Sequence, residues 1–217
     1  MTIKINYLKK NANKSSNLVL FTNDKFNLRL IEKNFSKSEL SYVNDLLKTS
    51  DLKKNIFIFE INSKKKIALI SIKSKLKISD IEKLGAEFYS RINYGRNIEY
   101  FINSDSVIGN YDNFLGHFLH GLKLRSYEFI KYKTKKSTRV ISVNVVGSKN
   151  RPSNQTQLKF KALEDGTFFA RDLVSEPGNI LHPDEYAKRL SSLKKNGLKV
   201  NIYDEKKLKK LGMYSLL

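Results

Sequence analysis

The sequence predicts an α/β protein with a mixed or largely parallel sheet. Two observations lead to this prediction. Short runs rich in β-branched and aromatic residues alternate along the chain with longer segments whose apolar residues recur at helical spacing. In addition, the segment "TRVISVNVV" (138–146) is an almost uninterrupted β-branched run, as expected for a strand whose two faces are both covered.

Six strands are predicted in the first two thirds of the chain. The first alternates apolar and polar residues, the second is a compact apolar run, and the third and fourth are separated only by the polar "NSKKK". In order, the predicted strands are "IKINYL" (3–8), "NLVLF" (17–21), "NIFIFEI" (55–61), "KIALISI" (66–72), "NIEYFI" (97–102) and "TRVISVNVV" (138–146).

Three helices are predicted between these strands. Segment 36–48 has Leu40, Val43, Leu46 and Leu47 on one face, and Ser36 followed by Glu39 predicts a capping box. Segment 78–92 has apolar residues at helical intervals, with Ser79 or Asp80 as the N-cap. For segment 110–129, the residues expected to face inward are Phe114, Leu115, Phe118, Leu122 and Tyr127.

After the polar, turn-forming segment 147–155, a helix is predicted over 156–174, and Pro177 stops it. Its apolar residues at helical spacing are Leu158, Leu163, Phe169, Leu173 and Val174. A further helix begins at Pro183 with His182 as its N-cap, and its first turn carries Asp184 and Glu185, which suits the helix dipole. A strand over 197–204 and a short helix over 205–212, closed by Gly212, follow.

The composition limits which cellular compartment and which classes of binding partner are expected. The 217 residues include no cysteine, which excludes disulfides and thiolate metal sites. The start "MTIKINYLKK" has no signal-peptide core, and no apolar run approaches the length of about 20 residues that spans a bilayer, so a cytoplasmic protein without a membrane partner is expected. The formal charge of +20 points to nucleic acid, yet the lysines are scattered in short runs, which also fits a general compositional drift.

The residues that stand out most are "FFARDLVSEPGNILHPDEYAKRL" (168–190), "GLKVNIYDEKKLKKLGMYSLL" (197–217) and, upstream, "FLHGLKLRSYEFIKYKT" (118–134). Together they resemble the leucyl aminopeptidase family, also called cytosol aminopeptidases. In that family an "ARDL-x-NEP-x-N" helix end leads into a "TP" helix start, followed by a strand and an "LGM" helix. Ser175 and His182 stand where the family often has Asn and Thr. The framework residues Pro177, Gly178, Asn179 and Pro183 are present.

The resemblance implies a fold, an activity and partners. The fold would be an accessory, macro-like α/β domain over residues 1–147, a linker over 148–155, and over 156–217 the connecting helix and the incomplete start of an α/β catalytic domain. The complete protein would be a homohexameric metalloexopeptidase that removes N-terminal residues from peptides. It would use two divalent metal ions, manganese, zinc or magnesium.

The resemblance assigns no site residue in this chain. The family supplies its metal ligands from segments such as "FDTGG" and "NTDAEGR", and neither occurs in the sequence. We therefore assign no catalytic, metal-binding or cofactor-binding residue, and we expect these 217 residues to be inactive and to bind no metal cofactor by themselves.

Several residues could carry chemistry without the resemblance. His117 and His120 are one helical turn apart and could in principle bind a metal, but their apolar neighbours favour an ordinary helix face. We favour helix-end and surface roles for three pairs of carboxylates, which are Glu164 with Asp165, Asp172 with Glu176, and Asp184 with Glu185. Asn179 is interpreted as a bonding partner of helix-end carbonyls, with a place facing a catalytic pocket as the alternative.

Other functions remain as alternatives. A non-catalytic module that binds nucleic acid, DNA included, or a nucleotide fits the charge and the α/β layout. An isolated macro-like domain that binds ADP-ribose is less favoured, because glycine-rich phosphate loops are absent. In the aminopeptidase interpretation, Leu208, Leu211, Leu216, Leu217 and the faces of the two preceding helices lack part of their core, so they should be exposed and prone to association.

Overall fold

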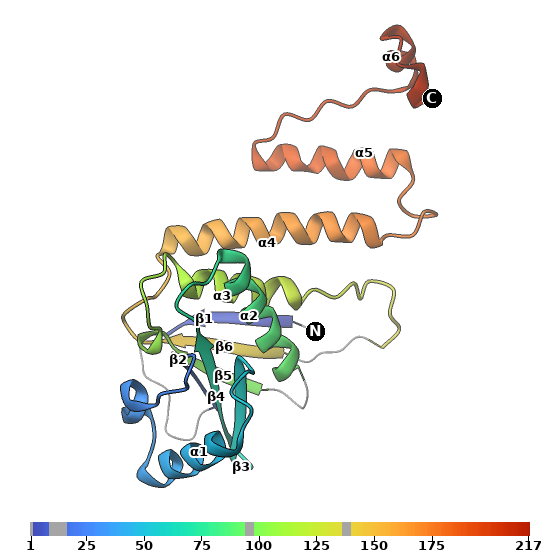
Figure 1. The fold of residues 1–217 in the computed structure, drawn as a ribbon. Coiled ribbons are helices and arrows are strands. Elements are labelled where there is room, and N and C mark those ends of the chain that lie inside the picture. The colour runs from blue at the N-terminus through green and yellow to red at the C-terminus, as the bar shows by residue number, and fades with distance from the viewer. Residues whose placement is uncertain (1, 9–16, 94–97, 136–139) are drawn as a thin grey trace. The chain divides into compact units, whose positions relative to one another are not determined.

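The computed structural model describes residues 2–8, 17–93, 98–135 and 140–217 (Figure 1). The chain divides into two compact units, residues 1–168 and residues 169–217. The first unit holds the sheet and the helices that cover it. The division falls within the long helix α4 (Asn154–Ser175), and the part of α4 from Phe169 onward belongs to the second unit.

The described strands form one six-stranded sheet in the order β1-β6-β5-β2-β4-β3. All neighbouring pairs are parallel except β3 and β4, which are antiparallel, so the predicted mixed α/β fold is confirmed. The strands are β1 (Thr2–Tyr7), β2 (Asn17–Asn23), β3 (Ile56–Asn62), β4 (Lys65–Ile72), β5 (Ile98–Asn103) and β6 (Val140–Val146). Residues 97, 138 and 139, which the sequence also assigned to strands, lie outside the described residues.

Each face of the sheet is covered by helices. On one face, α2 (Ile78–Ile92) and α3 (Phe114–Arg125) pack over a core of strand and helix side chains. The opposite face carries α1 (Lys37–Thr49) and the 3-10 helix η1 (Arg29–Asn34), as Figure 1 shows. A second 3-10 turn, η2 (Ser104–Ser106), follows β5. Burial on both faces explains why the central strands are nearly continuous apolar runs.

The beginning of α1 is also tied to the sheet. Ser36 and Glu39 form the predicted capping box, since the Ser36 Oγ accepts from the Glu39 N–H at 3.2 Å and Glu39 Oε2 accepts from the Ser36 N–H at 2.9 Å. The other carboxylate oxygen of Glu39 accepts from the buried Lys65 Nζ of β4 at 2.7 Å. Burial acts to raise the pKa of Glu39, but the hydrogen bonds from Lys65 and Ser36 outweigh it and hold this pKa below its ordinary value.

Two helix boundaries differ from the predictions. The N-cap of α2 is Lys77, not Ser79 or Asp80, because Asp80 lies inside the first turn and accepts from the Lys77 N–H at 3.1 Å. The helix expected over 110–129 is shorter, since α3 begins after Asn113, which has a left-handed backbone, and ends at Arg125. Tyr127 therefore lies beyond the helix, where its half-buried ring packs on Phe168 with centroids 5.3 Å apart.

Two glycines allow α2 and α3 to approach each other through their backbones. A Cβ atom placed on Gly85 of α2 would lie 1.9 Å from the backbone oxygen of Phe118, and one on Gly121 of α3 would lie 2.0 Å from that of Glu82. Neither distance is compatible with a side chain. The position of α3 over the sheet therefore depends on these two glycines.

The helix predicted after the linker is α4, and Ser153 caps it by accepting from the Thr156 N–H at 3.1 Å. The apolar residues whose spacing predicted this helix are not buried in the structure. Leu158, Leu163 and Val174 are exposed, and α4 instead buries Phe160. Their exposure confirms the expectation that this helix has apolar side chains without a core partner.

The second unit contains the end of α4 from Phe169 onward, α5 (Pro183–Ser191), the 3-10 turns η3 (Ser192–Asn196) and η4 (Tyr214–Leu216), and α6 (Glu205–Lys210). His182 is the N-cap of α5 as predicted, although its side chain makes no capping hydrogen bond. Gly212 closes α6 through a Schellman motif, in which Met213 N–H donates to the Leu208 carbonyl and Gly212 N–H to the Lys209 carbonyl, both at 3.1 Å.

The strand predicted over 197–204 is wrong, because this segment has no regular structure and no described strand pairs with it. A strand is stabilised by the ladder it forms with a neighbour, and an apolar pattern alone cannot supply one. Several large apolar side chains of this unit are exposed, including Leu211, Leu216 and Leu217 as expected, whereas Leu208 is half-buried.

The close approach of α2 and α3 leads to a prediction about two glycine substitutions. We expect Gly121→Ala to lower the free energy of unfolding by about 2 kcal/mol or more, because the added methyl group meets backbone atoms. The matched control is Gly166→Ala on α4, where nothing lies within 4 Å, and it should stabilise by about 0.5–1 kcal/mol. Urea denaturation of both variants checks this, and equal effects would contradict the packing described.

Candidate functional site

The two histidines of α3 are not joined in one site. His117 Nδ1 lies 3.2 Å from Glu82 Oε1 on α2, whereas His120 Nδ1 lies 3.1 Å from Glu164 Oε1 on α4. His120 is buried and His117 is half-buried. Each histidine therefore has its own carboxylate on a different helix, and the pair His120–Glu164 links α3 to α4.

Phe160 is the main apolar anchor of α4 within the first unit. Its ring lies between the two histidines, with centroid distances of 5.0 Å to each. The same ring covers Gly116, where an added Cβ would lie 2.6 Å from it. Because the residue on α3 beneath the ring is a glycine, the aromatic side chain of α4 can approach the α3 backbone.

A pocket of about 350 Å³ lies beside this anchor, between α3, α4 and the end of β1, and we call it the α3–α4 pocket. It contains both apolar walls and charged groups. Its lining residues are Ile5, Tyr7, Gly116, Leu119, His120, Lys123, Gln157, Phe160, Lys161, Glu164 and Asp165. The volume falls within the range of about 300–1,000 Å³ that is typical of small-molecule sites.

The pocket changes the ionisation of two of its residues. Burial raises the pKa of Tyr7 to about 12, and the nearby Glu164 carboxylate adds to this, while Arg151 opposes it. The Arg151 guanidinium carbon lies 5.3 Å from the centroid of the Tyr7 ring. Burial lowers the pKa of Lys123, an effect opposed by Glu164 and Asp165. Lys123 Nζ donates to the Ile3 carbonyl at 2.8 Å.

The carboxylates singled out from the sequence have different environments. Glu164 is half-buried in the pocket, so the predicted helix-end or surface role is wrong for it, whereas Glu176 lies at the end of α4 as predicted but is buried. Glu176 accepts from Arg189 of α5 at 3.2 Å, and Arg189 also binds Glu185 at 3.0 Å. These hydrogen bonds raise the pKa of Arg189 and connect the end of α4 to α5.

The prediction for Asn179 is also wrong in this structure. Its side chain is exposed and makes no hydrogen bond to another residue that the structure describes. The turn after α4 is closed by the backbone instead, since the N–H groups of Ile180 and Leu181 both donate to the Pro177 carbonyl at 2.9 Å. Backbone hydrogen bonds, rather than the Asn179 side chain, therefore hold this turn.

The described residues do not fit a two-metal centre. No group of three or more His, Cys, Asp or Glu side chains in the described ranges could hold a metal ion. His120 and Glu164 are only two donors, and each already has the other as its partner. Metal sites normally combine three or four ligands with supporting hydrogen bonds.

Sequence reasoning missed most of the α3–α4 pocket. Tyr7 was read only as part of a strand and Phe160 only as part of a helix, and Lys123 was one lysine among many. One signal was available: Gly116 and His120 are four residues apart, so they share a face of α3 that is not purely apolar. Neither the partner helix nor its register could be obtained from that spacing.

Comparisons with known proteins agree on one family. Residues 168–217 match the profile described as "Cytosol aminopeptidase family, catalytic domain". A probable cytosol aminopeptidase of Bradyrhizobium sp. is 44% identical over 101 residues, covering 45% of this chain and 20% of the relative. One from Agrobacterium fabrum is 40% identical over 106 residues, covering 46% and 21%. These matches thus span about a fifth of the length of the curated relatives.

Solved structures share the fold. A mutant of tomato leucine aminopeptidase aligns with a TM-score of 0.68 at 19% identity, covering 98% of this chain and 47% of that one. The bottromycin maturation enzyme BotP in complex with Mn aligns with a TM-score of 0.64 at 13% identity, covering 91% and 40%. The chain spans less than half of either structure.

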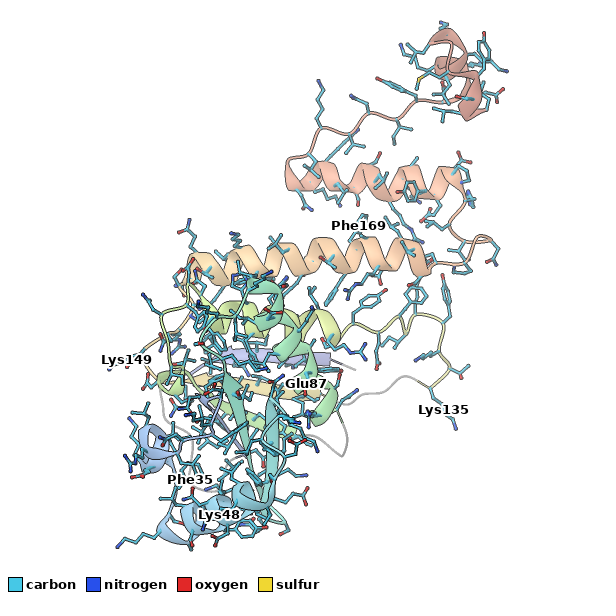
Figure 2. All side chains as sticks on the ribbon, viewed as in Figure 1. Phe35, Lys48, Glu87, Lys135, Lys149 and Phe169 are labelled. Carbon is cyan, nitrogen blue, oxygen red and sulfur yellow. The ribbon has the colours of Figure 1, made fainter. Side chains whose placement is uncertain are left out.

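These comparisons do not favour the alternative of a nucleic-acid- or nucleotide-binding module, because the matching family and relatives are aminopeptidases. The exposed lysines Lys48, Lys135 and Lys149 lie at separate places on the first unit in Figure 2, so their charge is dispersed. Within the described ranges, no helix combines the length and apolar character needed to cross a bilayer.

The ionisation of Tyr7 gives a prediction about pH. Its pKa is about 12 in the folded chain and 10.0 without the protein environment, so between these values the unfolded state binds fewer protons and stability falls as pH rises. Tyr7→Phe removes this contribution, and its free energy of unfolding should fall less steeply than that of the wild type from pH 10 to 12. Denaturant titrations across this range test it, and parallel curves would contradict it.

Proposed function

Because the chain belongs to the cytosol aminopeptidase family, we propose that it is the N-terminal portion of a metal-dependent leucyl aminopeptidase, a hydrolase that removes N-terminal residues from peptides. One observation carries this proposal. The match to the catalytic-domain profile covers residues 168–217, directly after an α/β unit whose fold also occurs in leucine aminopeptidase structures.

We propose the same division of the chain that the sequence suggested. Residues 1–147 are an accessory α/β domain, residues 148–155 a linker, and residues 156–217 the connecting helix with the start of the catalytic domain. The exposed apolar side chains of the second unit support this division, because such groups normally pack in a core. In the complete enzyme, further parts of the catalytic domain would cover them.

The proposed cofactors are two divalent metal ions, manganese, zinc or magnesium, which would polarise the peptide carbonyl and supply a nucleophilic water. Support comes from the family and from the manganese complex of BotP, a structural neighbour. The residues described in this chain do not form a matching ligand set. Their proposed part is structural: residues 168–217 supply the first elements of the catalytic domain.

The family name also supports proposals about partners and location. Peptides are the proposed substrates, and a homohexamer in the cytoplasm is the proposed working form. The absence of cysteine is compatible with that reducing compartment. DNA binding remains a separate hypothesis that rests on net charge alone.

The reading frame beyond the Leu217 codon provides the direct test of the proposed function. We expect an in-frame continuation that encodes segments similar to "FDTGG" and "NTDAEGR", because a two-metal site needs several carboxylates that converge on one place. Sequencing the transcript or the locus measures this. A long in-frame continuation without either segment would remove the basis for an aminopeptidase.

A second prediction concerns the activity of the 217-residue polypeptide itself. Since the sequence lacks both segments, the purified chain should not hydrolyse L-leucine p-nitroanilide, with or without manganese. A full-length cytosol aminopeptidase assayed in parallel is the positive control. Manganese-stimulated release of nitroaniline that co-elutes with the polypeptide would contradict the prediction.

A further inference from the structure

We propose that the α3–α4 pocket binds a free amino acid with an apolar side chain. The pocket belongs entirely to the first unit, so this proposal does not depend on the proposed peptidase activity. Three features carry it: charges of both signs without full partners, an apolar wall, and a volume of about 350 Å³. The charges match the ammonium and carboxylate groups of an amino acid, the apolar wall matches its side chain, and the volume is large enough for the whole molecule.

The charged groups of the pocket balance one another in number but are not fully paired. Lys123 and Lys161 are cationic, and Glu164 and Asp165 are anionic. Lys161 and Asp165 lie four residues apart on α4, yet neither forms an ion pair or hydrogen bond through its side chain with any residue that the structure describes. Cationic and anionic side chains that line one cavity without pairing with each other favour a ligand that carries a positive and a negative group.

The ammonium group of the ligand would bind at the carboxylates. Glu164 has a side chain that is only 12% exposed, and it uses one oxygen, Oε1, in the contact with His120. Its second oxygen and the carboxylate of Asp165 remain as acceptors. A partly buried carboxylate is stabilised by a hydrogen-bonding partner of opposite charge, which the ammonium group would supply.

The carboxylate group of the ligand would bind at the lysines. Lys123 has three N–H donors, of which one donates to the Ile3 carbonyl. Burial lowers the pKa of Lys123 although the nearby Glu164 and Asp165 oppose this effect, and a bound carboxylate would oppose it further. Lys161 also lines the pocket and is exposed, so its ammonium group is accessible to an incoming anion.

The side chain of the ligand would lie on the apolar wall formed by Ile5, Leu119 and Phe160. Phe160 and Leu119 are buried and held in place by the packing of α3 and α4. Other ligand classes fit less well. A polyphosphate would face Glu164 and Asp165, and a metal ion would lack a third ligand in the described part of the chain.

The test is calorimetric titration of the folded 217-residue chain with L-leucine. Two analogues separate the contributions: L-leucinamide lacks the carboxylate, and 4-methylpentanoate lacks the ammonium group. We expect saturable binding of L-leucine and binding at least about tenfold weaker for each analogue, as expected for the loss of a charged hydrogen-bonding group. In amide NMR spectra, the shifts should concentrate in residues 116–123 of α3 and 157–165 of α4.

Matched variants locate the site. Glu164→Gln and Lys161→Met should each weaken L-leucine binding by about tenfold or more. Glu82→Gln is the control for the first, because Glu82 is the partner of the other α3 histidine and lies outside the pocket. Lys159→Met is the control for the second, since Lys159 is exposed on α4 and does not line the pocket. Both controls should bind as the wild type does.

Three results would overturn the proposal: no saturable signal with L-leucine, analogues that bind as tightly as L-leucine, or control variants that weaken binding as much as the pocket variants. Lys161 is an exposed residue, so Lys161→Met is expected to fold even if Glu164→Gln does not, and it decides the outcome in that case. None of these results bears on the peptidase proposal, because the titration involves no catalysis.

Discussion

Backbone contact between α2 and α3 at Gly85 and Gly121 is the constraint on which the rest of the first unit depends. Without side chains at these positions, α3 lies close to α2 and directly over the sheet. That placement presents Gly116 and His120 to α4, where Phe160 and Glu164 bind them. The pocket beside them exists because α4 is held at this distance from β1 by one aromatic ring and one polar pair.

Much of the fold was predictable because its strands and helices have strong local patterns. All six strands of the described sheet and the α-helices of the first unit were predicted from hydrophobic period and capping residues, as the Ser36–Glu39 box illustrates, whereas the 3-10 helices η1 and η2 were not. The errors occur where a distant partner decides the outcome. Segment 197–204 has an apolar pattern but no ladder partner, and Asp80 has a capping side chain but lies within the first turn of α2.

The candidate site was much less predictable than the fold. The family resemblance from residue 168 onward depends on residues close together in the sequence, such as Pro177, Gly178 and Pro183, so it can be recognised without a structure. The comparisons agree with it. The α3–α4 pocket instead joins residues as distant as Tyr7 and Glu164. Helical spacing identified Leu158 and Val174 among the apolar residues of α4, but both are exposed and Phe160 is buried instead. Spacing alone does not show which side of a helix packs against a neighbouring element.

The topology of the sheet also has a consequence for synthesis on the ribosome. β1 is an edge strand whose only neighbour among the described strands is β6, and the Asn6–Asn144 hydrogen bond joins residues 138 positions apart. During synthesis β1 therefore waits until β6 has also been translated before it can pair. Such long-range parallel pairing slows folding and leaves the backbone hydrogen-bonding groups of β1 unpaired in the nascent chain, where they are open to pairing with other chains.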